Sequence, residues 1–478
     1  MVFSSIIFLF YFFPFCLAGY FLTPTLALRN IFLLLASLLF YYWGEPRFLP
    51  ILLVSITINF GIGLGLGHFA NPARGWLLAL GVTANLMLLT TVKYANFLTE
   101  NLNLLLQPMG TSLPALNITL PLGISFFTFH AVSYLVDIYR RKVPPERNPL
   151  TAALYIAMFP QLVAGPIIRF QQIAGQLHHR RSTCGRASAG IRIFIIGLAQ
   201  KALIANEVAN LADTVFANTT ASAAETWLGV IAYTLQIYFD FAGYSNMAIG
   251  LALIFGFTFP RNFRLPYRAR SVTEFWRRWH ISLSTWFRDY LYLPMGGNRH
   301  SQLRTYLNLM TVFLLCGLWH GASWNFIFWG FHHGAFLIVE RAGFGIYLGR
   351  RSIWLQRSYT LLAVMTGWVW FRANDLPHAL NIFRALIGSY SIDALNMQTH
   401  LALQPLTIMT LMAGAFFALK PDRKERLGRP SLWRLPLPAP LRRQALVAAD
   451  TMTIFSLLLL SVLTVGSGAY NPFLYFRF

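Results

Sequence analysis

The stretch Gly317–Gly334 reads GLWHGASWNFIFWGFHHG, and it sets one ionisable ring, His320, between a tryptophan and a glycine. His332 and His333 follow near its end, and no Lys, Arg, Asp or Glu interrupts it. An uncharged run of aromatic and small residues is typical of a segment at membrane depth, where each ionisable side chain is costly and therefore a functional candidate. The stretch predicts a membrane fold and makes His320 the first candidate.

The whole chain extends this pattern. Of its 478 residues, 56% are hydrophobic and only 11% are charged, whereas a soluble protein has about a quarter of its residues charged. The apolar runs are continuous rather than alternating, which favours membrane-spanning helices. We expect an all-α polytopic membrane protein whose residues 1–478 form a single integral-membrane domain. The first apolar run has no basic segment ahead of it, which predicts a first membrane helix rather than a removed signal peptide.

About a dozen apolar runs approach the ~20 residues that cross a bilayer. They lie near 4–22, 28–44, 48–67, 76–97, 120–138, 151–170, 188–208, 226–256, 305–319, 323–340, 357–372, 401–419 and 448–467. The segment Ala157–Phe170 reads AMFPQLVAGPIIRF and contains two prolines and a glycine. Irregular backbone is tolerated at membrane depth only where protein buries it or where it lines a cavity, so we expect this segment to be re-entrant.

The net charge of +22 comes from basic residues in short connections, after Tyr139, around His178 and from Arg261 onward. Loop charges of this kind encode orientation in a membrane, and we therefore expect no binding to nucleic acid. The stretch Lys420–Arg443 has eight Lys or Arg against two acidic residues, which predicts a cytoplasmic loop and a C-terminal tail on the far side. The three cysteines are widely spaced and predict no disulfide framework.

Three ionisable residues in apolar surroundings are functional candidates: Asp240, His280 and His320. The segment around His280 has helical character, and spacing by three and four residues puts Arg277, His280, Ser284 and Arg288 on one face. This predicts an amphipathic helix at the bilayer edge or along a water-filled cavity. The alternative is an interfacial helix whose histidine is merely solvated.

If the segment around His320 is helical, Cys316 and Ser323 lie one turn away on the same face. A neutral imidazole in a dry site can accept a proton from a hydroxyl, which is what acyl transfer to an alcohol requires. The alternatives are a core histidine without chemistry, and Cys316 as an acyl-accepting nucleophile rather than a small buried hydrophobe. A metal site with His332 and His333 matches no common ligand spacing, so we expect no metal.

Two long motifs resemble those of the membrane-bound O-acyltransferase (MBOAT) family, within it the bacterial alginate O-acetyltransferase branch. They are EFWRRWHISLSTWFRDYLYLPMGGNR from Glu274 and GLWHGASWNFIFWG from Gly317. The resemblance covers nearly the whole chain, with further matching segments that start at Leu120, Phe159, Gln236 and Gly367. One departure is Asn246, where relatives often carry an acid, which speaks against an essential proton carrier at that position.

The resemblance implies the MBOAT fold, with a ring of about 11 or more transmembrane helices and re-entrant segments around a thin centre. A cavity from each side meets there near the family's essential histidine. That residue corresponds to His320 in the LWHG motif, and His280 in the WHISL motif corresponds to its catalytic partner. We expect substrate binding from six further residues: Arg277, Ser284, Arg288, Asp240, Trp319 and Asn325.

The resemblance also implies a membrane O-acetyltransferase that moves acetyl from cytoplasmic acetyl-CoA for O-acetylation of an extracytoplasmic polysaccharide, alginate or another exopolysaccharide. An extracytoplasmic SGNH-type partner would relay the acetyl group. The expected location is the bacterial inner membrane, in contact with membrane lipids. Acetyl-CoA would serve as donor substrate, and no cofactor is expected.

Other functions remain open at this point. A protein of the same family can transfer D-alanine to teichoic acid or a fatty acyl group to a protein. Broken helices with an intramembrane carboxylate also fit a transporter, although the chain shows no paired halves of the kind many transporters have. A scaffold of a polysaccharide export complex, without chemistry of its own, is the third alternative.

Overall fold

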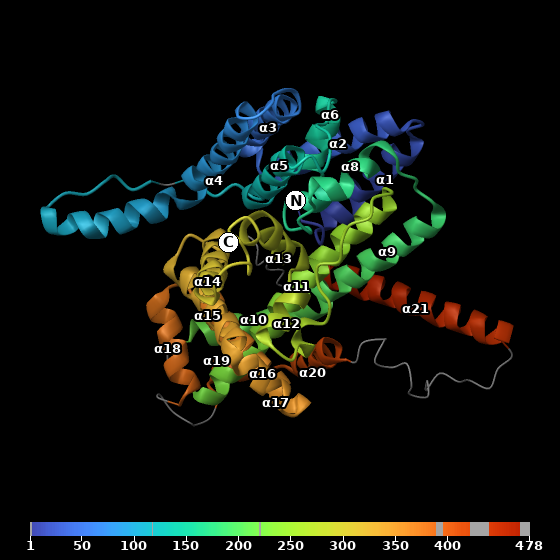
Figure 1. Cartoon of the computed structure of the whole chain (residues 1–478). Coiled ribbons are helices and arrows are strands. Elements are labelled where there is room, and N and C mark those ends of the chain that lie inside the picture. Colours follow the sequence, from blue (N-terminus) through green and yellow to red (C-terminus); the bar gives the residue numbers. More distant parts are fainter. Residues whose placement is uncertain (1, 117, 219–220, 389–394, 421–438, 469–478) are drawn as a thin grey trace.

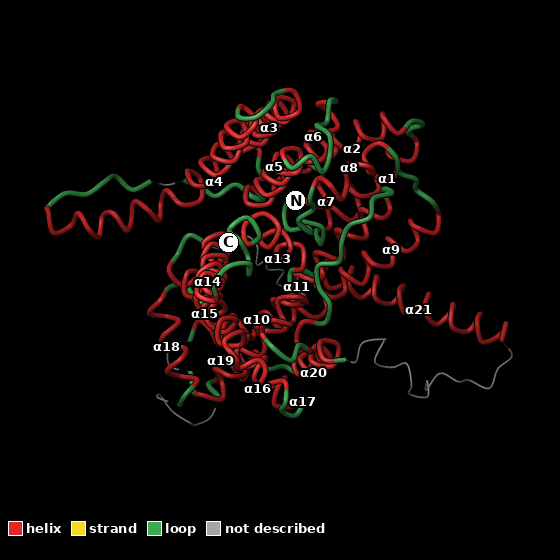
Figure 2. Tube along the Cα trace, viewed as in Figure 1, coloured by secondary structure: helices red, strands yellow, loops and turns green. Residues whose placement is uncertain are grey.

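The computed structural model describes residues 2–116, 118–218, 221–388, 395–420 and 439–468. Within these ranges the chain forms α-helices with shorter 3-10 and π-helical segments and no β-strand (Figure 2). Six helical stretches are long and apolar enough to cross a membrane, and three shorter apolar helices accompany them. The prediction of an all-α polytopic membrane protein is therefore confirmed.

The N-terminal part consists of long apolar helices. A π-helical turn, η1 (Phe8–Phe12), leads into α1 (Phe13–Leu22), and α2 (Leu26–Gly44), α3 (Leu49–His68), α4 (Ala73–Leu106) and α5 (Ile124–Tyr139) follow. Each boundary has a local cause: the Thr25 hydroxyl accepts a hydrogen bond from the Leu28 N–H and so caps the start of α2. Helices α3 and α4 pack on α5 and lie at the edge of the molecule (Figure 1).

The proline-rich segment after α5 is broken, as predicted. It forms α6 (Pro149–Ala157), the single turn α7 (Phe159–Leu162), an irregular stretch and then α8 (Phe170–His178). All residues from 157 to 168 are buried, so protein surrounds the irregular backbone. The Tyr155 hydroxyl donates to the carbonyl of Ile168 at 3.0 Å, which satisfies part of that backbone. The apolar run 151–170 is therefore not one membrane helix, because two prolines and a glycine interrupt it.

The central helices pack tightly against one another. Helix α9 (Cys184–Ala199) continues through the π-helix η4 (Gln200–Ala205) into α10 (Asn206–Ala217), and α9 packs along α11 (Ala223–Ile254). The backbones meet at glycines: a Cβ added at Gly190 would lie 2.6 Å from the Gly250 carbonyl oxygen, so the helices could not approach as closely with a larger residue there.

The remaining helices complete a ring. They are α12 (Val272–Arg278), α13 (Ile281–Phe287), η6 (Arg288–Tyr292), α14 (Gln302–His320), α15 (Trp324–Val339), η7 (Glu340–Phe344), α16 (Gly345–Gly349), α17 (Ile353–Arg372), α18 (Leu376–Leu386), α19 (Met397–Ala402), α20 (Pro405–Leu419) and α21 (Ala439–Gly466). In Figure 1, α10, α11, α13, α14 and α15 stand around a common centre, and α21 projects from the body. Aromatic side chains such as Trp276 and Trp329 fill this centre.

The two ends of the helices differ in charge. Long-range hydrogen bonds from Tyr20 to the Phe255 carbonyl and from Arg74 to the Ile138 carbonyl bring several Arg-rich connections to one end. Connections at the opposite end, 107–123 and 321–323, contain no Lys or Arg. By the positive-inside rule, this asymmetry favours a cytoplasmic position for the basic end.

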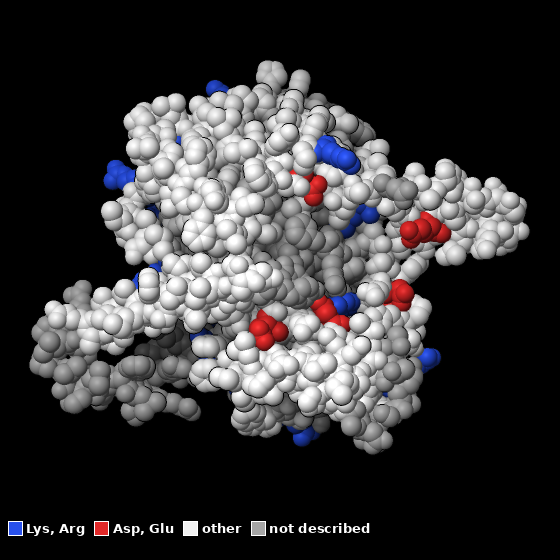
Figure 3. Space-filling view, turned by 180° about the vertical axis from the view of Figure 1, so that it is seen from behind, with Lys and Arg blue, Asp and Glu red and all other residues white. Residues whose placement is uncertain are grey.

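Charge is also sparse on the sides of the molecule. On the face shown in Figure 3, most of the visible described surface carries neither Lys or Arg nor Asp or Glu, as expected for a surface that faces lipid. Of the predicted cytoplasmic loop Lys420–Arg443, residues 421–438 lie outside the described residues, as does the tail 469–478.

Candidate active site

His320 is the last residue of α14. The helix ends there because Gly321 adopts an extended conformation with φ −160° and ψ 149°. The imidazole is only 7% exposed, and three aromatic rings surround it edge-on: ring centroids lie 4.7 Å away for Trp319, 5.0 Å for Trp329 and 5.0 Å for Phe371. The backbone turn after a helix end therefore presents a histidine inside an aromatic cage.

Because α14 ends at His320, Ser323 does not share a helical face with it, and that prediction was wrong. Ser323 instead precedes the first turn of α15, where its hydroxyl donates to the Asn325 side-chain oxygen at 2.5 Å. Cys316 does lie one turn before His320 on α14 and is buried. The sequence-predicted pairing of His320 with a hydroxyl on its own helical face is therefore absent.

The predicted amphipathic helix around His280 was also wrong as a single element. Helix α12 ends at Arg278, and His280 takes a left-handed conformation with φ 41° and ψ 54° before α13 begins. Such a conformation costs a non-glycine residue about 1–3 kcal/mol and persists only where the surroundings hold it. The break separates the buried His280 from Arg277 and Arg288, which are exposed, so no common polar stripe exists.

The surroundings of His280 define which ring nitrogen carries the proton. Its Nδ1 lies 3.2 Å from the side-chain oxygen of Asn262, and the Asn262 amide nitrogen donates to the Ser245 hydroxyl at 2.9 Å. That second bond orients the amide, so in neutral His280 the proton is on Nδ1 and Nε2 is an acceptor. Nε2 is buried and has no hydrogen-bond partner among the described residues.

Trp319 lies between the two histidines. Its ring centroid is 4.7 Å from that of His320 and 6.3 Å from that of His280. Its indole N–H is buried and unpartnered in the part of the chain that the structure describes. His280 Nε2 thus offers an acceptor near His320, and the Trp319 indole N–H offers a donor, as does the unpartnered indole N–H of Trp329, whose ring centroid lies 5.0 Å from that of His320.

Sequence reasoning missed Lys93, which fixes the end of α14. The Lys93 ammonium donates to the carbonyl of Trp319 at 2.5 Å, to the carbonyl of His320 at 3.2 Å and to the Ser125 hydroxyl at 3.3 Å. A cation here satisfies carbonyls that a helix C-terminus leaves without partners. A signal existed: Lys93 interrupts the apolar run 76–97, and a charge at membrane depth is rarely without a role.

A cavity of about 470 Å³ lies beside this turn, toward the end of the molecule that is poor in basic loops. It reaches the surroundings of His320 through Lys93, which holds the His320 carbonyl, and Phe371, which packs on the imidazole. Its lining consists of Lys93, Leu120, Gly321, Ala322, Ser323, Asn325, Phe326, Phe371, Arg372, Ala373 and Asn374. A solute from this end of the molecule can therefore approach the His320 turn.

On the opposite side, stacked rings run from Trp319 toward the basic end. Trp319 stacks on Phe129 with 5.2 Å between ring centroids, and Phe129 stacks on Trp286 at 4.0 Å. Trp286 in turn contacts Tyr290, 5.2 Å away. This aromatic column connects the catalytic candidates with a polar network at the basic end.

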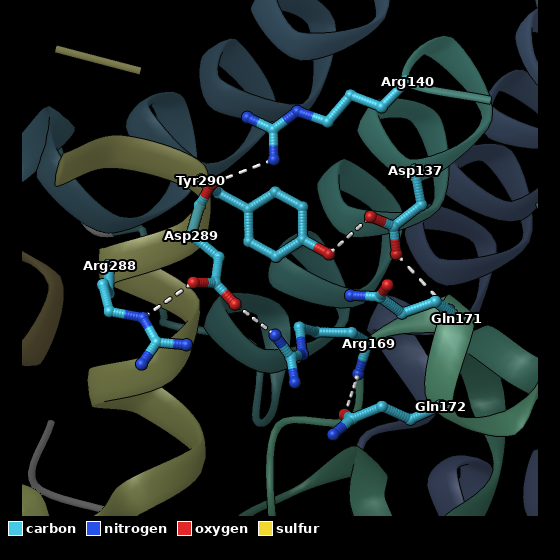
Figure 4. Close-up of polar contacts among 8 residues, drawn as sticks. All are labelled: Asp137, Arg140, Arg169, Gln171, Gln172, Arg288, Asp289 and Tyr290. Carbon is cyan, nitrogen blue, oxygen red and sulfur yellow. Dashed lines mark hydrogen bonds and ion pairs between the residues drawn. The ribbon is translucent and has the colours of Figure 1, made fainter. Parts of the chain in front are cut away.

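That network joins α5, the start of α8 and η6 (Figure 4). The Tyr290 hydroxyl donates to Asp137 at 2.8 Å, and Asp289 binds the guanidinium groups of both Arg169 and Arg288. Arg140 donates to the Asp289 carbonyl at 2.9 Å. The hydrogen bond with Asp289 raises the pKa of Arg288, so this exposed guanidinium stays cationic.

The other predicted site residues lie apart from the two histidines or are already engaged. Asp240 pairs with Lys201 at 2.7 Å, and both side chains are 3% exposed. The Asn325 amide donates to the carbonyls of Ala373 at 2.7 Å and Trp370 at 3.3 Å, which joins α15 to the end of α17. The Ser284 hydroxyl donates back to the Trp279 carbonyl at 3.5 Å. Substrate binding by these residues stays a prediction.

No group of three or more His, Cys, Asp or Glu residues that could hold a metal ion occurs among the described residues. In a metal site of the kind considered from the sequence, His332 and His320 would both be ligands of one metal ion. Its Nε2 instead lies 2.8 Å from the Ala363 carbonyl, which makes it a hydrogen-bond donor.

Comparison with known proteins agrees with this site. Residues 77–375 match the membrane-bound O-acyltransferase family. The chain is 41% identical to a probable alginate O-acetylase AlgI of Pseudomonas putida over the full length of both proteins. It is 37% identical to a peptidoglycan O-acetyltransferase of Helicobacter pylori over 81% of this chain and 80% of that protein. A teichoic acid D-alanyltransferase of Bacillus subtilis is 30% identical over 53% of this chain and 67% of its own length. The chain therefore belongs to the membrane-bound O-acyltransferase family and is a multi-pass membrane acyltransferase.

Proposed function

We propose that this chain is an O-acetyltransferase of the bacterial inner membrane. It passes acetyl from cytoplasmic acetyl-CoA to an extracytoplasmic hydroxyl, for the O-acetylation of a polysaccharide. The observation that carries the proposal is the position of His320, between a cavity at the extracytoplasmic end and an aromatic column that leads to the cytoplasmic end. The names of the relatives, which concern alginate and peptidoglycan, support acetyl as the group and a polysaccharide as the acceptor.

His320 acts as the general base. An acceptor hydroxyl enters through the cavity, and its oxygen attacks the thioester carbonyl while the imidazole takes its proton. The C–S bond breaks, an O–C ester bond forms, and the thiolate recovers the proton from the imidazolium. Proton transfer of this kind contributes about 10²–10⁴-fold, and holding both reactants in place contributes further. All steps use the two substrates and side chains of this chain, so we propose no metal and no cofactor.

The unpartnered groups of Trp319 and His280 suit different atoms of the donor. The Trp319 indole N–H can donate to the thioester carbonyl oxygen, where negative charge develops. Neutral His280 offers an acceptor at Nε2, which suits an amide N–H of the pantetheine arm. His280 therefore orients the donor. Trp319 stabilises the negative charge on the carbonyl oxygen, so His280 does not need to be protonated for that purpose.

The donor's phosphates would bind at the cytoplasmic end of the aromatic column. Arg140 and Arg288 both contact Asp289 there, and both guanidinium groups are exposed. Guanidinium groups bind phosphate oxygens well because their N–H groups form a planar fork. Arg277 is exposed on α12, and it can add to this positive field.

We further propose that the hydroxyl belongs to an extracytoplasmic SGNH-type partner, which then acetylates the polysaccharide. The cavity beside His320 measures about 470 Å³, which is within the range of pockets that enclose one small molecule. This volume supports the entry of one side chain or one sugar unit that carries the hydroxyl, rather than the enclosure of a long polymer segment.

The decisive experiment replaces His320 in cells that lack their own copy of the gene. His320→Ala should lower the ester-linked acetyl content of the surface polysaccharide by about 10²-fold or more while polysaccharide export continues. The control is His332→Gln, which keeps an N–H donor for the Ala363 carbonyl. Full acetylation with His320→Ala would refute the catalytic role. Competition of acetyl-CoA with D-alanyl and fatty acyl donors on purified protein distinguishes the alternatives within the family.

A further inference from the structure

A second cavity, separate from the proposed active site, lies at the cytoplasmic end of α3, α4 and α5. It has a volume of about 340 Å³ and three cationic residues in its wall: Arg74, Arg141 and Lys142. No Asp or Glu is among the described residues that line it. The other lining residues are Leu66, Gly67, Phe69, Ile138, Val143, Pro144 and Pro145.

The three cations have different roles in this cavity. Arg74 is 7% exposed, and its guanidinium donates to the carbonyls of Leu66 at 2.8 Å and of Ile138 and Tyr139 at 3.1 Å each. It thereby ties the ends of α3 and α5 together and forms the floor. Arg141 and Lys142 are exposed at the turn that follows α5, so their charges are available to a ligand.

The nearby acids are held by other groups. Glu146 is buried, and it accepts hydrogen bonds from His178 at 2.7 Å and from the Asn148 N–H at 2.9 Å. The Asp137 carboxylate accepts hydrogen bonds from Tyr290 at 2.8 Å and from the Gln171 N–H at 3.3 Å. Both carboxylates keep their charge, but the three cations in the wall outnumber these two acids, so the net charge around the cavity is positive and favours an anion.

The surface of α3 and α4 beside the cavity is apolar. Phe69 is 50% exposed and Trp76 is 76% exposed, and the large apolar side chains Leu64 and Leu80 on α3 and α4 are exposed as well. Aromatic residues at the end of an apolar span are typical of the boundary between lipid and water. Figure 1 shows α3 and α4 at the edge of the molecule.

We propose that this cavity binds the headgroup of an anionic phospholipid from the cytoplasmic leaflet. The phosphate contacts Arg141 and Lys142 above the Arg74 floor, and the acyl chains lie along the exposed apolar faces of α3 and α4. The nucleotide part of the acyl donor fits this place poorly. Lys93, beside the active site, lies 19 residues further along α4, which corresponds to about 28 Å of helix.

The experiment measures lipid retention on the detergent-purified full chain by native mass spectrometry and the shift in Tm. The probes are phosphatidylglycerol, phosphatidylcholine and inorganic phosphate. Phosphatidylglycerol should bind and raise Tm, whereas the other two should not. Arg141→Gln with Lys142→Gln should weaken phosphatidylglycerol binding about 30-fold, because each basic residue at an anionic surface contributes about fivefold.

The matched control is Arg350→Gln with Arg351→Gln, which removes two exposed charges from the same end of the molecule and should leave retention unchanged. Unchanged retention in the Arg141/Lys142 variant would overturn the proposal, and so would equal protection by inorganic phosphate. A raised KM for acetyl-CoA in the same variant would reassign the cavity to the donor. The lipid readout needs no acyl transfer, so it stands or fails separately from the proposed function.

Discussion

Two groups of polar side chains lie deep in this protein, and they differ in what their polar atoms bind. In the first, between η4 and α11, Lys201 pairs with Asp240 at 2.7 Å, and Asn246 donates to Gln200 at 2.8 Å. In the second, at the end of α14, His280 Nε2 and the Trp319 indole N–H are buried without a partner among the described residues. The charged and amide groups of the first group bind one another, whereas His280 Nε2 and the Trp319 indole N–H bind no other described residue.

The difference separates a structural polar site from one prepared for a ligand. A buried polar atom without a hydrogen bond costs about 1–3 kcal/mol, so native proteins rarely keep one unless something else completes it. The second group also adjoins the 470 Å³ cavity through Lys93. Asp240 and His320 were equal candidates in the sequence because both are ionisable residues in apolar segments. The structure distinguishes them by whether the polar atoms around each residue have hydrogen-bond partners.

The largest expected effect is a loss of stability, and it tests whether the Lys201–Asp240 pair has a structural role. Asp240→Asn should destabilise the protein by about 3–5 kcal/mol, because it leaves the Lys201 charge buried without its counter-charge. The double variant Lys201→Met with Asp240→Leu should recover most of that loss and keep acyl transfer. Thermal unfolding in detergent and an acetylation assay measure both quantities. A double variant that is stable but inactive would contradict the structural role and would show that Asp240 is needed for substrate binding or catalysis.

An intermediate effect is expected at Lys93. Lys93→Met leaves the carbonyls of Trp319 and His320 without their donor, at a cost of about 1–3 kcal/mol in stability. Since the end of α14 then loses its anchor, kcat should fall more than KM for the donor changes. Lys93→Arg, which keeps the charge and the N–H donors, should restore part of kcat. If kcat stays at the wild-type level in Lys93→Met, Lys93 does not position His320.

The smallest effect is expected at His280. His280→Asn introduces a residue that also tolerates the left-handed conformation, but it removes the acceptor at Nε2. The loss of one hydrogen bond to the donor should lower kcat/KM by about 2-fold to 10-fold. Steady-state kinetics with acetyl-CoA measure this. A loss as large as that of His320→Ala would show that His280 takes part in the chemistry and does not only orient the donor.

Several features could be predicted from local sequence alone. The runs near 28–44 and 226–256 correspond to α2 and α11, because about 20 apolar residues form a helix wherever lipid surrounds them. Two prolines and a glycine predicted the break within Ala157–Phe170. His320 and His280 were selected by their motifs, and both lie in the aromatic centre of the ring.

Other features depend on contacts between distant parts of the chain. The helical spacing around His280 predicted one helix, but the Asn262 side chain binds His280 and Ser282 across the break. Likewise, spacing put Ser323 beside His320, whereas α14 ends at His320. A periodicity argument sees neighbours along a helix, and it has no access to a side chain that arrives from another element.

The sequence by itself determined the membrane class and the approximate spans, and it selected the two histidines as candidates, because hydrophobic length and motif are local properties. Only the tertiary structure decided which polar atoms are engaged. Lys93 and Trp319 are 226 residues apart in the sequence, yet the Lys93 Nζ lies 2.5 Å from the Trp319 carbonyl oxygen. The Asp240 carboxylate forms an ion pair with Lys201. Buried polar groups are satisfied by whatever the packed helices bring near, so their roles follow from the fold as a whole.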